Sequence, residues 1–259
     1  MRTHKLSVWA VTVLVITIFS TFIARAVAGE KTWSVSLSSD FVSKYVGFGN
    51  GGVFDKDPMF QTCLGVSHKS GFHADIWWGT GLDDNLVGSG FDDEIDYNVG
   101  FANVVPFTNG KLMFDLGVGY WDIYNLFTSR RNDLLHPFVE LSYPIKVSGD
   151  ITLTPFVKFD GYNIPFETDF EEGTITSAGC KYRFNLGRGF AFTGLTSFGY
   201  DDGGFGFQRG VIWKDYLNLE VTISSHLTWR VAEAQFYIPL GVTDRDTEQV
   251  YGTGFTWTF

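Results

Sequence analysis

The sequence predicts an all-β fold, a transmembrane antiparallel up-and-down β-barrel of about 12 strands. Three observations predict it: segments in which apolar and polar residues alternate, connections that are long and short in turn, and a C-terminal segment that is aromatic on one face. Successive side chains of a strand point to opposite sides, so alternation gives each strand one apolar and one polar face. A membrane barrel needs this pattern because its outer face meets lipid and its inner face meets water or other side chains.

The C-terminal segment, residues 249–259, shows the alternation most clearly. One face of this strand carries Tyr251, Thr253, Phe255, Trp257 and Phe259, and the other carries small or weakly polar residues. The last strand of a soluble β-sandwich is the alternative. A soluble protein would seldom expose such an aromatic face, whereas a barrel in lipid requires one, so the segment favours the barrel.

Residues 1–28 are predicted to be a secretory signal peptide, which leaves residues 29–259 as the outer-membrane β-barrel domain. The segment has a positively charged start, an apolar stretch over 6–24 and a small-residue cleavage site at 26–28. An uncleaved membrane anchor is the alternative, but the cleavage site and the strand-like sequence after it favour removal. Export together with a membrane barrel predicts the outer membrane of a diderm bacterium.

The composition limits the classes of function. The chain has 19 Lys and Arg against 29 Asp and Glu, a formal net charge of −10, and no basic cluster, which argues against nucleic acid as a partner. Hydrophobic residues are 44% of the chain, as expected where apolar and polar residues alternate. No cofactor is expected. Cys63 and Cys180 are assigned to opposite faces of different strands, so no disulfide between them is expected.

Strands with this alternation are predicted along the whole chain after the signal peptide. Counts of ten or fourteen stay open, and 206–213 could form a strand of its own. The predicted strands cover 33–48, 58–68, 72–82, 93–104, 111–122, 133–145, 150–160, 173–184, 189–200, 215–225, 230–241 and 249–259.

The connections between these strands alternate between long and short. Short connections carry turn-forming pairs, among them Ser70-Gly71, Asn109-Gly110, Ser148-Gly149 and Leu186-Gly187. An up-and-down barrel produces this alternation, with tight turns at the periplasmic rim and longer loops outside. A soluble Greek-key sandwich has no reason to alternate so regularly.

Charged residues on the inner face are the candidate functional residues. Separated acidic and basic walls would set a field across a water-filled pore and bias which solutes pass. The alternative is mutual ion pairing inside a filled lumen, because a twelve-stranded barrel lies between eight-stranded filled barrels and sixteen-stranded open porins. The predicted pore-lining residues are Asp75, Asp96, Asp115 and Glu140 on an acidic arc, and Lys158, Lys181 and Arg183 on the basic arc beside it.

No enzymatic activity is expected. A rim hydrolase needs a nucleophile and a base within hydrogen-bond reach, and only His136 with Ser129 in the preceding loop offers a faint candidate for a lipid-modifying enzyme. The sequence has no G-x-S-x-G motif and no Cys/His zinc spacing.

A non-conducting structural or adhesive barrel is a further alternative. The acidic run 167–172 is interpreted as a solvated rim, with divalent-cation bridging to glycolipid phosphates as the alternative.

Three stretches in the first third carry a family resemblance: S-S-D-F-V-S-K-Y-V-G-F-G at 38–49, G-F-H-A-D-I-W-W-G-T at 71–80 and D-E-I-D-Y-N-V-G-F at 93–101. They are similar to the TorF-type porin family of uncharacterised bacterial outer-membrane β-barrel proteins. In 47–49, Gly-Phe-Gly stands where relatives often have an aromatic-Arg-Gly. The resemblance implies a passive channel for small solutes in the outer membrane and supplies no catalytic residues. Expected partners are outer-membrane lipid, small solutes and, through the C-terminal strand, the barrel-assembly machinery.

Overall fold

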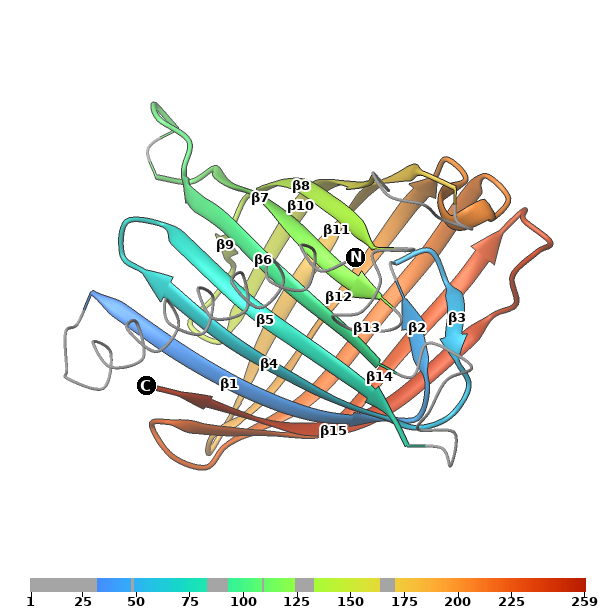
Figure 1. Cartoon of the computed structure of the whole chain (residues 1–259). Coiled ribbons are helices and arrows are strands. Elements are labelled where there is room, and N and C mark those ends of the chain that lie inside the picture. The colour runs from blue at the N-terminus through green and yellow to red at the C-terminus, as the bar shows by residue number, and fades with distance from the viewer. Residues whose placement is uncertain (1–31, 48, 83–92, 109, 124–132, 164–170) are drawn as a thin grey trace, which may run out of the picture.

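The structure is a computed structural model that describes residues 32–47, 49–82, 93–108, 110–123, 133–163 and 171–259 (Figure 1). The predicted signal peptide, Ser129 and most of the acidic run 167–172 lie outside the described residues, so the predictions about them are not addressed by the fold. Within the described part of the chain, no helix has the length and hydropathy needed to cross a membrane.

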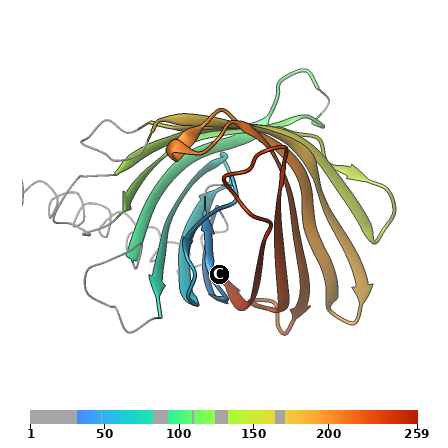
Figure 2. The ribbon, with the colours of Figure 1, turned by 90° about the vertical axis from the view of Figure 1, so that its right-hand side faces the viewer.

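Twelve antiparallel strands close into a single barrel, which confirms the predicted fold class and strand number (Figures 1 and 2). Each strand pairs with its neighbours in the sequence, and the ring closes where the last strand pairs with the first. The barrel strands are β1 Trp33–Val42, β4 Met59–His68, β5 Phe72–Gly81, β6 Asp93–Val104, β7 Met113–Ile123, β8 Leu134–Ser142, β10 Ile151–Tyr162, β11 Gly173–Gly187, β12 Phe190–Asp201, β13 Gly210–Thr222, β14 Leu227–Leu240 and β15 Glu248–Thr258.

The closing seam joins β1 and β15 in antiparallel register. Leu37 lies opposite Trp257 and Phe41 opposite Thr253, so residues predicted to face outward on both strands share the outer face. A one-residue shift would turn every side chain of a strand to the other face, so this register keeps the aromatic row of β15 outside. Closure also pairs the backbone groups that an open edge would leave unsatisfied in lipid.

The outer face is apolar around the barrel, as the alternation predicts. Exposed large hydrophobic side chains include Trp78, Leu116, Val157, Phe198 and Tyr251, one on each of five strands. Burial of such surface in lipid contributes roughly 25 cal/mol per Å². The alternation of the connections is also confirmed, and we name the two ends of the barrel the short-turn rim and the long-loop rim.

At the short-turn rim, the turn glycines take backbone conformations that other residues rarely adopt. Gly71 and Gly110 have φ of 107° and 77°. A Cβ at Gly71 would lie 2.0 Å from the carbonyl oxygen of Ala102 on β6. Only glycine therefore fits where this turn passes β6. The turn pairs read from the sequence therefore mark the tight connections correctly here.

Several strand bounds differ from those predicted. The first barrel strand ends at Val42 instead of continuing to 48, and the chain then forms a separate two-stranded sheet of β2 Tyr45–Gly47 and β3 Gly52–Asp55. Strand β13 begins at Gly210, so 206–213 is not a strand of its own, because Val211 to Trp213 continue the pairing with β14. The strand predicted over 133–145 is interrupted, and its end is the short β9, Ile145–Lys146.

Candidate functional site in the lumen

The β2–β3 hairpin packs against the inner wall at the long-loop rim. It lies at the end of the barrel opposite the C-terminus (Figure 1). Val46 of β2 packs in one apolar cluster with wall residues that include Met59, Ile212 and Tyr237. Phe54 of β3 packs against a second cluster that contains Trp121, Leu134 and Tyr162. Apolar side chains from the hairpin and the wall therefore fill much of the lumen at this end.

Tyr45 anchors the hairpin to the wall by a polar contact inside this apolar setting. Its hydroxyl donates to Oε2 of Glu94 at 2.9 Å, and its ring lies 5.9 Å from that of Trp77. Burial raises the pKa of Tyr45 well above its usual value, and the nearby carboxylates of Glu94 and Asp96 raise it further. The hydroxyl therefore stays protonated and donates to Glu94.

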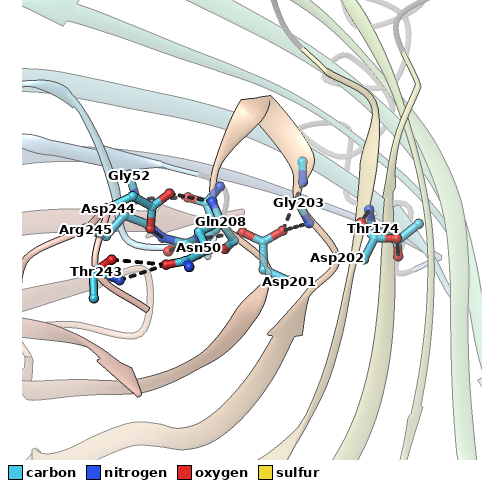
Figure 3. A network of polar contacts seen from close by, with 11 residues as sticks. Asn50, Gly52, Thr174, Asp201, Asp202, Gly203, Gln208, Thr243, Asp244 and Arg245 are labelled. Carbon is cyan, nitrogen blue, oxygen red and sulfur yellow. Dashed lines mark hydrogen bonds and ion pairs between the residues drawn. The ribbon is translucent and has the colours of Figure 1, made fainter. Parts of the chain in front are cut away.

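A buried arginine connects the loops around the hairpin (Figure 3). Arg245, between β14 and β15, donates through Nη1 to Oδ2 of Asp201 at 2.6 Å and to the carbonyl oxygen of Asn50 at 2.9 Å. Its Nη2 donates to the carbonyl oxygen of Gln208, and its guanidinium carbon lies 5.0 Å from the centre of the Phe207 ring. We name this set of contacts the Arg245 clamp.

The clamp fixes three connections of the long-loop rim to one another. Asn50 belongs to the hairpin turn, Gln208 to the β12–β13 connection and Arg245 to the β14–β15 connection. The Asp201 carboxylate also accepts from the backbone nitrogen atoms of Gly203 and Gly204, at 3.0 and 3.1 Å. The Arg245 and Asp201 side chains are 2% and 0% exposed, so loss of either would leave the other charge buried without its partner.

Two cavities of the lumen carry opposite charge. The acidic cavity has a volume of about 350 Å³ and the basic cavity about 410 Å³. The hairpin contributes to both, through Tyr45 and Val46 in the acidic cavity and Gly49 in the basic cavity. The acidic cavity is lined by Val42, Lys44, Tyr45, Val46, Gln61, Cys63, Asp75, Trp77, Asp96, Asn98, Gln235 and Val250. The basic cavity is lined by Gly49, Trp121, His136, Glu140, Phe156, Lys158, Asp160, Tyr162, Ile175, Ser177, Lys181, Leu195, Ser197, Gly199, Ile212 and Lys214.

The residues predicted as the acidic arc lie in three different surroundings. Asp75 and Asp96 line the acidic cavity, and the Asn98 amide donates to Asp75 at 2.9 Å. Asp115 lies outside both cavities, with its Oδ1 2.9 Å from Nε2 of His73. Glu140 lines the basic cavity, where it accepts from Lys181 at 2.6 and 2.8 Å.

The residues predicted as the basic arc are paired with carboxylates. Besides the contact of Lys181 with Glu140, Lys158 lies 2.8 Å from Asp160 and Arg183 lies 3.1 Å from Glu220. Lys158 and Lys181 line the basic cavity, and Arg183 lies nearer the short-turn rim. Lys181 on β11 reaches past β10 to Glu140 on β8, so an ion pair joins the two predicted arcs where they meet.

Two further charged residues of the lumen, Lys214 and Arg230, were not predicted from the sequence. Lys214 was assigned to a connection because the strand was predicted to begin after it, whereas β13 begins at Gly210 and turns Lys214 inward. Arg230 lies 2.8 Å from Asp40 and 2.6 Å from Glu233, on strands β1 and β14. By alternation Arg230 would share the outward face of Phe236 and Ile238, but a register shift between Arg230 and Glu233 turns it inward.

His136 faces inward as expected. Its Nε2 lies 2.9 Å from Oδ1 of Asp160, and its ring lies 4.4 Å from that of Trp121 and 5.1 Å from that of Tyr162. Cys63 and Cys180 are both free in the structure. Across the described residues, no three His, Cys, Asp or Glu side chains are grouped so as to hold a metal ion.

No family model matches the chain. No curated protein matches it either. Solved structures do match. The NanC porin is 12% identical, with 86% of this chain and 98% of that chain covered and a TM-score of 0.53. The KdgM porin, in complex with disordered oligogalacturonate, is 8% identical over 87% of this chain and 99% of that chain, with a TM-score of 0.53.

The COG4313 outer membrane channel from Pseudomonas putida F1 is 9% identical over 88% of this chain and 96% of that chain, with a TM-score of 0.52. The chain has the fold of these outer-membrane barrels. At such low identities the likeness concerns the fold alone. The resemblance to the TorF-type family therefore stays a prediction.

Proposed function

We propose that the chain is a porin of the bacterial outer membrane, which lets small polar solutes diffuse through a lumen narrowed by the β2–β3 hairpin. The observation that carries the proposal is the contrast between the two faces of the closed barrel. The outer face is apolar, while the inner face carries charged side chains around two cavities. Charged groups that line a water-filled lumen select solutes by their charge.

The fold supports this proposal. The three solved structures reported above are named as porins or as an outer membrane channel, and each is covered almost completely by this chain. Outer-membrane lipid would contact the apolar outer face. The barrel-assembly machinery would engage the C-terminal strand β15, whose alternating aromatic face was predicted from the sequence.

A non-conducting structural barrel is the second candidate, and one observation favours it. The hairpin, the two apolar clusters and the Arg245 clamp together occupy much of the lumen at the long-loop rim. If this filling is complete in the membrane, the cavities would be reached only from the short-turn rim. An enzymatic role is not proposed, since His136 is packed among aromatic rings and contacts Asp160.

Single-channel conductance in a planar bilayer tests the porin proposal. The refolded chain without residues 1–28 is compared with a variant in which Lys158, Lys181 and Arg183 are changed to Gln. We expect discrete conductance steps whose selectivity moves toward cations in the variant, because Asp160, Glu140 and Glu220 lose their partners. Lys111→Gln, at the short-turn rim, is the control for loss of a positive charge. A folded barrel that gives no steps would contradict the proposal.

A further inference from the structure

The basic cavity holds more ammonium groups than carboxylates. Lys158, Lys181 and Lys214 line it together with Glu140 and Asp160, and with His136 counted as neutral one positive charge is left over. These residues come from four strands, β8, β10, β11 and β13, so the excess is a property of the closed barrel and not of one segment. Its volume of about 410 Å³ lies within the range of ligand-sized pockets.

The excess charge belongs to Lys214. Lys181 contacts both carboxylate oxygens of Glu140, and Lys158 contacts Asp160. The Nζ of Lys214 lies 5.1 Å from the centre of the Tyr237 ring, and within the described residues no carboxylate forms an ion pair with it. A partly buried ammonium group without a counter-charge is unfavourable, so an anion that enters the cavity would be stabilised beside it.

The rest of the wall supplies groups that suit a small polar solute. Ser177 and Ser197 provide hydroxyl donors, and Phe156 and Leu195 provide apolar surface. We propose that the basic cavity binds a small monocarboxylate solute, with Lys214 as the counter-charge of its carboxylate. The single excess charge matches a monoanion better than a phosphate dianion. This inference rests on the proposed function, since the solute reaches the cavity through the lumen.

Equilibrium binding in detergent micelles tests the inference without requiring conduction. The refolded chain is titrated calorimetrically with sodium glucuronate, with glucose as the uncharged match and glucose 6-phosphate as the dianion. We expect glucuronate to bind and glucose to bind much more weakly. Lys214→Gln should weaken glucuronate binding by about tenfold, the effect of losing one charged hydrogen bond. Lys214→Arg should retain binding, and Glu140→Gln should tighten it because Lys181 loses its partner.

Lys111→Gln, which removes a positive charge outside the cavity, is the control and should bind glucuronate as the unchanged chain does. Equal binding of glucuronate by Lys214→Gln would overturn the inference, as would tighter binding of glucose 6-phosphate or no binding by a folded barrel. Because the titration needs no ion flow, a barrel that binds glucuronate but gives no conductance steps would contradict only the porin proposal. A conducting barrel that does not bind glucuronate would contradict only the monocarboxylate site.

Discussion

Ion pairs occur at both ends of the lumen, but their surroundings differ. At the long-loop rim, the Arg245 and Asp201 side chains are 2% and 0% exposed. Nearer the short-turn rim, those of Arg183 and Glu220 are 47% and 21% exposed. The same chemistry therefore serves different purposes. The buried pair holds loops and the hairpin in place, whereas the more exposed pair contributes little to stability.

The largest effect is expected from breaking the buried pair. Arg245→Met leaves the Asp201 carboxylate buried without its partner and also removes the contacts to Asn50 and Gln208. We expect a loss of about 3–5 kcal/mol in the free energy of unfolding. Guanidinium unfolding of the refolded barrel, followed by tryptophan fluorescence, measures it. An unchanged midpoint would show that the Arg245 clamp does not hold the rim together.

An intermediate effect is expected from Tyr45→Phe. The change removes only the hydroxyl that donates to Glu94, and the ring can keep its contacts with Trp77 and Phe54. Because a buried carboxylate then loses a donor, we expect a loss of about 1–3 kcal/mol in the free energy of unfolding, measured in the same way. A loss as large as that of Arg245→Met would indicate that the hairpin is anchored by Tyr45 more than by the Arg245 clamp.

A change in selectivity with little change in stability is expected from Glu140→Gln. The substitution frees the ammonium group of Lys181 in the basic cavity. We expect the reversal potential in a salt gradient to move toward anion selectivity, which is the opposite sign to the change expected on neutralising the lysines. A shift toward cations, or none, would show that the basic cavity does not lie on the path of the ions.

The smallest effect on stability is expected from Arg183→Gln. The pair with Glu220 is partly open to solvent, so its loss should lower the free energy of unfolding by less than about 1 kcal/mol. Unfolding curves of this variant and of Arg245→Met, recorded under the same conditions, measure the contrast between the two ends directly. Similar losses in the two variants would remove that contrast.

The sequence predicted the barrel well because its signal is repeated along the chain. Alternation over about ten residues shows which side of a strand faces out. The same pattern recurs in all twelve strands, so each one supports the barrel. The hairpin was missed because β2 and β3 have three and four residues, too few to show a period, and they follow β1 almost directly. The strand predicted over 33–48 therefore wrongly included the residues of β2.

The contacts of the site could be predicted only in part. Inward positions such as Glu140 and Lys181 follow from alternation, but their ion pair spans β8, β10 and β11 and depends on the register of β10 with its two neighbours. The Arg245 clamp joins residues that lie in different connections, separated by 44 positions for Asp201 and 195 for Asn50. Nothing in the local sequence of a connection indicates such a partner.

The most direct test of the account is the single-channel conductance of the barrel with and without its hairpin. Residues 45–55 are replaced by a short Gly-Ser linker, and the shortened barrel is compared with the unchanged chain in the same planar bilayer. We expect small discrete steps for the unchanged chain and clearly larger steps for the shortened one. Equal conductance in two folded barrels would show that the hairpin does not narrow the lumen. No conductance in either would show that this barrel is not a porin.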